Sequence, residues 1–477
     1  MSPPGSVGPT VDDGRVRNDG SASRAVLRLP KLTYRRRTEL GLLTMAAVVT
    51  VGGYVLVDLG AKGKIPADLA AFCGIIVALS LVAHLATRWL APQANPVMLP
   101  IVALLNGLGF DFIARISASG GPYAHETQYQ AAWTALGVLA YVVTLAVIRR
   151  TVDLERFRYL VALAGVGLLL LPLVPKIGLD INGARLWIHV GTLTFQPVEL
   201  AKLALCFFFA SYLVEKRELL STRTMRVGNH LYPDPRALGP IAVAWGFAMV
   251  VIMAERDIGF AALLFVTFIT MLWLTTGRFT YLAVGLLLFA VGAWFASQHF
   301  GQVSVRITTW LDPWKTPLGS GYQVVQSQYA LGSGGVGGLG LGLGHPQLIP
   351  VASTDFIFSI IGEELGLLGT TTMVFAFVLL VGAGIRTALA ARSDFARLTA
   401  AGLTTIVGFQ AFFIMGGITR LLPLTGVTLP FVAYGGSALI SNYILVAVLM
   451  RISNETDETA ARERAELSVR LSQRIDR

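Results

Sequence analysis

The segment DFIFSIIGEELGLLGTTTMVFAFVLLVGAGI spans residues 355–385 and carries no charged side chain after its first third. About 20 predominantly apolar residues suffice for an α-helix to cross the hydrocarbon core of a bilayer. The segment therefore predicts a membrane span, with Asp355 at its mouth. Because ionisable side chains are costly at membrane depth and usually serve a function there, Asp355 is the first candidate site residue.

The composition extends this interpretation to the whole chain. Hydrophobic residues make up 54% of the 477 residues, charged residues make up 14%, and the mean hydropathy is +0.65. Such values are typical of a polytopic membrane protein, and we expect an all-α bundle without a sizeable soluble domain. The apolar runs predict twelve spans, at residues 39–59, 66–90, 97–114, 130–148, 158–175, 196–214, 238–255, 258–276, 280–298, 355–385, 398–420 and 435–452.

Positive charges indicate the orientation of these spans. Arginines cluster before the first span and in the loops after the fourth, sixth and tenth spans, whereas Lys62 and Lys64 go against this bias. By the positive-inside rule those loops and both termini are cytoplasmic, and the long loop 299–354 is extracytoplasmic. We expect residues 1–38 to be a disordered cytoplasmic tail and residues 454–477 to be a second cytoplasmic tail.

The net charge of +10 does not indicate a nucleic-acid partner. The cations stand beside the spans, where anionic lipid headgroups attract them, so membrane lipids are the expected partners. Cys73 and Cys206 fall inside apolar spans and are expected to be packed thiols.

The glycine-rich run GSGGVGGLGLGLG (332–344) allows two interpretations. It is either a flexible low-complexity loop, or a place where bare backbone amides approach an anionic group or another chain closely. Its GxGxxG pattern is not taken as a dinucleotide site, because no strand precedes it.

A polar stripe is predicted where the loop 182–195 enters the sixth span. Gln196, Glu199 and Lys202 are spaced by three and would share one face of a helix. Glu199 and Lys202 can then pair, either as a structural ion pair between helices or as part of a phosphate site.

Four further residues are candidates for substrate binding. Arg185 could add positive charge for a phosphate, and Trp187 is either an interfacial anchor or a platform for a sugar. Asp257 lies in a short outer loop, where a charge needs no function. Glu363 is preferred to Glu364 as a cavity residue, because on a helix it falls about 80° from Asp355 while Glu364 is nearly opposite.

Five blocks of the sequence, in order, resemble the SEDS family, which includes RodA, FtsW and SpoVE. The blocks are NGARLW (182–187), FQPVELAKL (195–203), YQVVQSQYALGSGG (322–335), TDFIFSIIGEELG (354–366) and LPLTGVTLPFVAYGG (422–436). The resemblance covers residues 97–452, so the fold it implies is a ten-helix core at 95–453 preceded by two additional spans at 39–94. Those two spans resemble the longer actinobacterial RodA members. AERDIG (254–259) and Ala433 depart from the usual pattern.

This resemblance implies a peptidoglycan glycosyltransferase that polymerises lipid II into β-1,4 glycan strands for cell elongation. Asp355 matches the essential aspartate of the family, and Arg185, Trp187, Glu199 and Lys202 fall at motif positions. A carboxylate beside a partly desolvated cavity can take the proton from an attacking sugar hydroxyl, and cations can stabilise the departing pyrophosphate. The implied partner is a class B penicillin-binding protein.

Other functions stay open at this point. A lipid II flippase would carry polar residues through the full depth of the membrane, whereas the uncommon polar groups here gather on the outer side. A scaffold for wall enzymes and a role in division like that of FtsW are further alternatives. No metal site is predicted, and the need for a divalent cation is left open.

Overall fold

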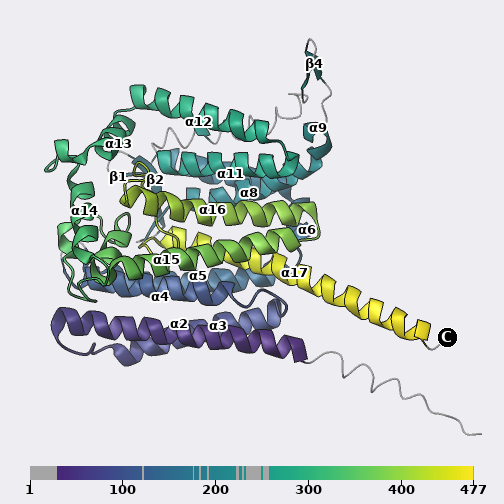
Figure 1. The fold of residues 1–477 in the computed structure, drawn as a ribbon, viewed down its shortest axis with the longest axis horizontal. Helices are drawn as coiled ribbons and strands as arrows, with labels where there is room; N and C mark the ends of the chain where they lie inside the picture. The colour runs from purple at the N-terminus through teal and green to yellow at the C-terminus, as the bar shows by residue number, and fades with distance from the viewer. Residues whose placement is uncertain are drawn as a thin grey trace, which may run out of the picture.

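The structure is a computed structural model that describes residues 30–120, 123–175, 177–181, 184–190, 193–221, 225–227, 230–232, 246, 249–250 and 257–475. Long helices lie side by side in a bundle, as Figure 1 shows. The first half of the chain contributes α2 (Pro30–Lys62), α3 (Leu69–Leu90), α4 (Met98–Ser117), α5 (Glu126–Val147), α6 (Thr151–Arg156), α7 (Arg158–Leu170), α8 (Val198–Glu215) and α9 (Arg217–Ser221). The second half contributes α11 (Ile258–Thr276), α12 (Phe279–His299), α13 (Gly301–Leu311), α14 (Tyr322–Gly334), α15 (Ile357–Ala390), α16 (Asp394–Ile418) and α17 (Gly436–Ile475).

The helical membrane fold predicted from the sequence is confirmed. Nine helices among the described residues are long and apolar enough to cross a membrane: α2, α3, α4, α5, α11, α12, α15, α16 and α17. The predicted fifth and sixth spans correspond to the shorter apolar helix Arg158–Leu173 and to α8. The predicted seventh span, 238–255, lies almost entirely outside the described residues, so the count of twelve stays a prediction.

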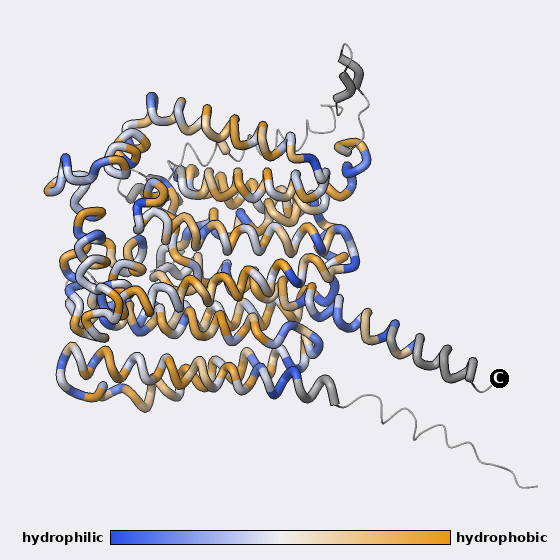
Figure 2. The backbone as a smooth tube through the Cα atoms, in the orientation of Figure 1, coloured by the Kyte–Doolittle hydropathy of each residue, from blue (hydrophilic) through white to orange (hydrophobic). Residues whose placement is uncertain are grey.

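Apolar residues follow the bundle helices along their length, and hydrophilic residues gather at the helix ends (Figure 2). The largest fully buried side chains include Tyr141, Phe112, Phe209 and Phe395, which come from α5, α4, α8 and α16. The bundle therefore has one packed interior that many helices share.

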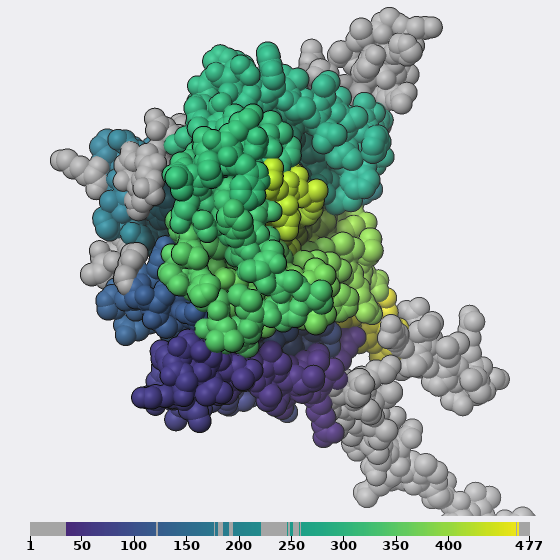
Figure 3. Space-filling view, turned by 60° about the vertical axis from the view of Figure 1, so that its left-hand side comes forward, coloured from purple at the N-terminus to yellow at the C-terminus, as the bar shows by residue number. Residues whose placement is uncertain are grey.

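The additional N-terminal spans are the hairpin of α2 and α3, coloured purple in Figures 1 and 3. Helix α2 begins at Pro30, so the prediction of a disordered tail up to residue 38 was wrong for its last nine residues. The reason is a set of polar contacts. Arg36 pairs with Glu39 and donates to the backbone oxygen of Ala94, and the second oxygen of Glu39 lies 2.8 Å from His84 Nδ1.

One end of the bundle, which we call the loop end, carries the elements that connect the helices there (left in Figure 1). The predicted loop 299–354 is largely helical, because it contains α13, α14 and the 3₁₀ turns η3 (Pro313–Lys315) and η4 (Pro346–Leu348). A three-stranded antiparallel sheet of β1 (Gly178–Ile181), β2 (Ala184–Val190) and β3 (Leu193–Phe195) was not predicted from the sequence. A second hairpin, β4 (Met225–Val227) with β5 (His230–Tyr232), lies near the opposite end.

Helix α15 is broken at Gly366, where the backbone adopts φ 65° and ψ −161°. The break leaves peptide groups on both sides without helical partners, and the glycine-rich run supplies the missing ones. The hydrogen bonds run from Leu339 N to Glu363 O (2.9 Å), Gly340 N to Glu364 O (3.0 Å), Leu367 N to Gly335 O (2.9 Å) and Leu368 N to Val336 O (3.1 Å). Non-helical backbone in a membrane protein is tolerated only where such partners exist. The run is thus an ordered part of the fold, and its interpretation as a flexible loop was wrong.

Candidate active site at the loop end

A cavity of about 200 Å³ lies at the loop end and contains Asp355. The aspartate stands two residues before α15, in a turn, and is half-buried. Polar side chains from three other segments share the cavity: Arg306 and Thr309 of α13, Ser320 and Gln323 at the start of α14, and Arg420 after α16. In Figure 3, which brings the loop end forward, green segments from the second half of the chain cover the middle of this face.

Both arginines are held by backbone carbonyls of neighbouring segments. Arg306 Nη1 donates to Thr425 O over 2.8 Å, while Arg420 Nη2 donates to Trp310 O and Leu311 O, each over 3.0 Å. Neither guanidinium has a carboxylate within salt-bridge distance among the described residues. The cavity therefore combines one acidic side chain with two cations that form no direct ion pair with a described carboxylate.

Two carboxyl groups at this end have raised pKa values. Burial raises the pKa of Asp355 to about 6, although the charge of Arg306 and a hydrogen bond from Thr354 act in the opposite direction. Burial also raises the pKa of Asp257 to about 7, opposed by the Phe260 amide and by Arg306. Asp257 accepts the Phe260 amide over 3.0 Å and so caps α11. Both carboxyls lie within electrostatic reach of Arg306.

The predicted pairing of Glu199 and Lys202 is confirmed. The two side chains meet at 2.5 Å on α8, and both are almost fully buried. Lys202 Nζ also donates to Gln410 Oε1 of α16 over 2.9 Å and lies 5.6 Å from the centre of the Phe260 ring. The pair thus joins α8 to α16 and lies outside the set of residues that line the Asp355 cavity.

Three other predicted site residues lie apart from that cavity. Arg185 and Trp187 are on β2 two residues apart, so they point to the same face of the sheet; Arg185 is exposed and Trp187 is half-buried. Gln196 precedes α8, so it does not share a helix face with Glu199 and Lys202 as predicted. Its backbone amide donates to Ser437 Oγ over 3.0 Å.

Glu363 also lies elsewhere, against the glycine-rich run. Its carboxylate accepts the His345 amide over 3.1 Å. The neighbouring Glu364 accepts the amides of Gly342 (2.8 Å) and Gly344 (3.2 Å) and pairs with Arg115. The anionic groups that the bare amides approach are therefore the chain's own carboxylates.

Sequence reasoning selected neither Arg306 nor Arg420 as a site residue. The sequence did hold a pointer to Arg306 as a site residue, because it is the only arginine between residues 299 and 354. Its closeness to Asp355 depends on how α13 folds back over the bundle, which no local pattern reports. Among the described residues, no group of three or more His, Cys, Asp or Glu side chains is placed to hold a metal ion.

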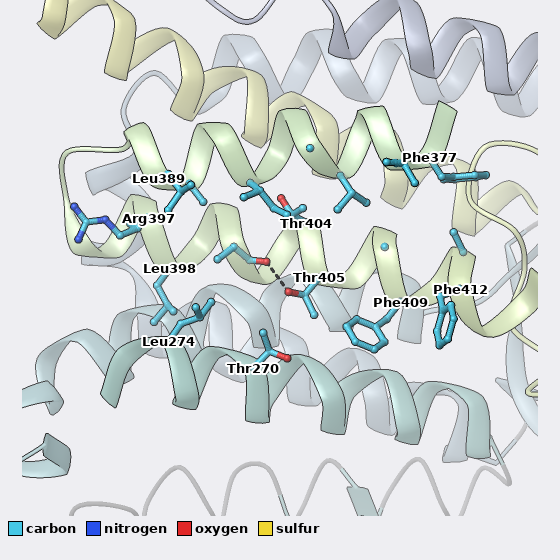
Figure 4. A pocket seen from close by; sticks show the side chains of 18 of the residues that line it. Thr270, Leu274, Phe377, Leu389, Arg397, Leu398, Thr404, Thr405, Phe409 and Phe412 are labelled. Atoms are coloured by element: carbon cyan, nitrogen blue, oxygen red, sulfur yellow. Dashed lines mark hydrogen bonds between the residues drawn. The ribbon is translucent and has the colours of Figure 1, made fainter. Parts of the chain in front are cut away.

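A second hollow of about 920 Å³ lies between α11, α15 and α16, and Figure 4 shows it. Its lining is mostly apolar, with Phe377, Leu389, Leu398, Phe409 and Phe412 among the labelled side chains. The hydroxyls of Thr404 and Thr405 donate to carbonyls one turn back in their own helix, over 2.7 and 2.8 Å. We call this hollow the apolar groove.

Comparisons with known proteins give consistent results. Residues 96–458 match the family described as cell cycle protein FtsW, RodA and SpoVE. The chain is 41% identical to the peptidoglycan glycosyltransferase RodA of Mycobacterium tuberculosis over 430 residues, which are 89% of this chain and 92% of that protein. It is 38% identical to the stage V sporulation protein E of Bacillus subtilis over 60% of this chain and 76% of that one.

Solved structures agree with these sequence matches. A chain from a structure titled "Structural coordination of polymerization and crosslinking by a peptidoglycan synthase complex" superposes with a TM-score of 0.62 at 26% identity. The match covers 76% of this chain and 98% of that chain. The crystal structure of Thermus thermophilus RodA superposes with a TM-score of 0.54 at 26% identity, covering 76% and 96%.

Proposed function

The chain belongs to the FtsW, RodA and SpoVE family, and from this premise we propose that it polymerises lipid II into β-1,4-linked glycan strands at the outer face of the cytoplasmic membrane. It is a peptidoglycan glycosyltransferase of the RodA type and a multi-pass membrane protein. The observation that carries the proposal is the cavity at the loop end, where the Asp355 carboxylate lies with Arg306 and Arg420.

Asp355 would act as the general base. A sugar hydroxyl of the acceptor attacks C1 of the donor sugar, its proton passes to the Asp355 carboxylate, and the bond from C1 to the pyrophosphate oxygen breaks. A single attack on an α-linked donor inverts C1 to the β configuration, so no enzyme nucleophile is required. The raised pKa of Asp355 suits this role, because a base works best when its pKa is close to the working pH.

Arg306 and Arg420 would stabilise the pyrophosphate that departs. Guanidinium groups hold phosphate oxygens through charge-assisted hydrogen bonds, and here both groups are fixed by backbone carbonyls before a substrate arrives. Glu199 and Lys202 do not line the cavity and form a buried ion pair, so we assign them to holding α8 against α16. Arg185 and Trp187 are on a sheet at the same end and are placed to meet a longer substrate there.

The first test replaces Asp355 by asparagine. Asparagine keeps the size of the side chain and also caps a helix well, but it cannot accept the proton. We expect purified Asp355→Asn protein to bind lipid II and to lose polymer formation by about 10²- to 10⁴-fold. Asp312→Asn is the matched control, because Asp312 is a half-buried capping aspartate at the same end, outside the cavity lining, that accepts the Trp314 amide.

Near wild-type polymerisation by folded Asp355→Asn protein would exclude the catalytic role. Lipid II supplied on the accessible face also separates this function from the flippase alternative. An enzyme converts the lipid to polymer, whereas a protein that only transports it leaves it intact.

A class B penicillin-binding protein is the proposed partner, and the apolar groove is its proposed docking site. The groove is lined by membrane-spanning helices, and its threonine hydroxyls are already satisfied by their own helices, so it suits an apolar transmembrane helix. Arg217, Asp394 and Arg397 at one end of the lining could meet charges beside such a helix.

Gly382→Trp tests this docking, because Gly382 lines the groove and has open space where a side chain would start. We expect co-purification with the penicillin-binding protein to fall at least tenfold, while the isolated mutant still polymerises lipid II. Gly74→Trp is the control, since Gly74 on α3 is equally open and lies away from the groove. Equal co-purification of the two variants would show that the partner docks elsewhere.

A further inference from the structure

The N-terminal hairpin of α2 and α3 lies outside the family match, which begins at residue 96. We propose that the loop-end turn of α2 positions the glycine-rich run and, through it, the segment that carries Asp355. Gly60 of α2 is the residue that makes this contact close. The inference rests on the proposed function only where it speaks of catalysis, because the contact itself can be tested without substrate.

Backbone meets backbone where α2 touches the run. A Cβ added to Gly60 would lie 2.1 Å from Leu341 O, and one added to Gly342 would lie 2.4 Å from Val57 O and 2.7 Å from Ala61 N. Real Cβ atoms do not approach other atoms this closely, so the two segments pack at a distance that only glycine allows. In Figure 3 the purple hairpin lies directly against the green elements of the loop end.

Helix α2 is itself held firmly against the core helix α4. A Cβ on Gly107 of α4 would lie 1.9 Å from Thr50 Oγ1, and a Cβ on Gly53 of α2 would lie 2.4 Å from Asp111 Oδ2. Small residues at such positions let helices approach closely and pack well in membranes. Helix α2 is therefore anchored on α4 about two turns before Gly60.

The glycine-rich run connects this support to α15. Glu364 Oε2 and Oε1 accept the amides of Gly342 and Gly344, and Arg115 of α4 donates both to Glu364 Oε1 (3.2 Å) and to Gly344 O (2.7 Å). The four backbone hydrogen bonds on the two sides of Gly366 hold the preceding part of the run. A displacement at Gly342 would thus disturb groups on α4 and on α15 together.

Further hydrogen bonds hold the segment between the glycine-rich run and Asp355. The Val351 amide donates to Tyr123 Oη over 3.0 Å, Ser353 Oγ donates to Glu126 Oε1 over 3.1 Å, and Ser353 O accepts the Tyr434 amide over 2.8 Å. Asp355 follows two residues later. A displacement of about 1 Å at a catalytic group can cost about 10²-fold in rate, so this path can affect turnover.

The experiment compares Gly60→Val with Gly52→Val in the full-length protein. Both glycines lie on α2 and are half-buried, but a Cβ at Gly52 meets nothing within 4 Å. We expect Gly60→Val to speed hydrogen exchange in residues 335–355 while α11 and α16 stay protected. Turnover at saturating lipid II should fall about 10- to 100-fold with little change in KM. Gly60→Ala should give a smaller effect in both measurements, and Gly52→Val should give none.

Each other outcome contradicts part of the inference. Unchanged exchange in 335–355 would show that α2 does not hold the run. Faster exchange with normal turnover would show that the contact does not position Asp355. Faster exchange throughout the bundle would show that the contact only stabilises the whole fold. If the wild-type protein fails to polymerise lipid II, the proposed function fails, while the exchange result still decides whether α2 holds the run.

Discussion

The proposed role of Asp355 as the general base rests on what surrounds its carboxylate. The sequence was sufficient to select this residue, since a lone carboxylate at the mouth of an apolar segment is uncommon. It was not sufficient to select Arg306, whose charge acts on both Asp355 and Asp257 from a separate helix. The spacing of Glu199 and Lys202 predicted their pair, but the third member, Gln410, is 208 residues away from Lys202. Local spacing reports neighbours on one helix and gives no information about such partners.

The pH dependence of turnover follows from the environment of Asp355. A base must be ionised, and its raised pKa means that the ionised fraction falls as the pH drops through about 6, instead of through the ordinary value of 3.8. We expect kcat/KM for lipid II to decrease with an acid limb near pH 6. Arg306→Gln removes a charge that lowers this pKa and should move the limb to higher pH, whereas Arg306→Lys should leave it nearly in place. A flat profile down to pH 5 would exclude Asp355 as the base.

At the scale of elements, α15 shows where sequence patterns stop being informative. Its apolar run predicted a span at 355–385, and the helix runs from Ile357 to Ala390. The break at Gly366 was not predicted, because a glycine inside an apolar run is compatible with a continuous helix. The break depends on the glycine-rich run, which supplies hydrogen bonds to both sides of it. Two segments that each look irregular in sequence are therefore one structural unit.

Gly366→Ala should destabilise the folded protein by about 1–3 kcal/mol, because a residue with a Cβ is strained at φ 65°. The added Cβ would also lie 2.3 Å from Gly338 N. The measurement is the midpoint of thermal unfolding in detergent. Gly382→Ala on the same helix is the control, since that position has open space and helical backbone. Equal midpoints for the two variants would mean that the backbone at residue 366 accepts a Cβ without loss of stability.

At the scale of the whole molecule, the bundle was predictable and its organisation at the loop end was not. Apolar runs predicted the spans because hydropathy is a local property. The start of α2 and the end of α17 both lie at the end opposite the loop end, which agrees with an even number of spans (Figure 1). The sheet of β1–β3 and the helices α13 and α14 were not predicted from the sequence. They are short, and their stability depends on packing against the bundle.

The orientation of the bundle stays a prediction that labelling can test. In a background with Cys73→Ala and Cys206→Ala, Leu318→Cys at the loop end should react with an impermeant thiol reagent in sealed cells. Leu318 is 91% exposed. Ala390→Cys, at the opposite end of α15 and also exposed, should react only after the membrane is opened. Labelling of Ala390→Cys in sealed cells would reverse the orientation.

We expect the break in α15 to set the height of the candidate site above the bilayer. The segment from Leu367 to Ala390 is about 36 Å long at roughly 1.5 Å per residue, which alone exceeds the roughly 30 Å hydrocarbon thickness. We therefore expect the turns before Gly366, and Asp355 before them, to lie beyond the acyl chains. A lipid-anchored substrate keeps its tail among the acyl chains and its pyrophosphate at the level of the headgroups. Under the proposed function its sugars would extend to the level of Asp355, and the length of one helix would then decide which bond of the lipid is within reach.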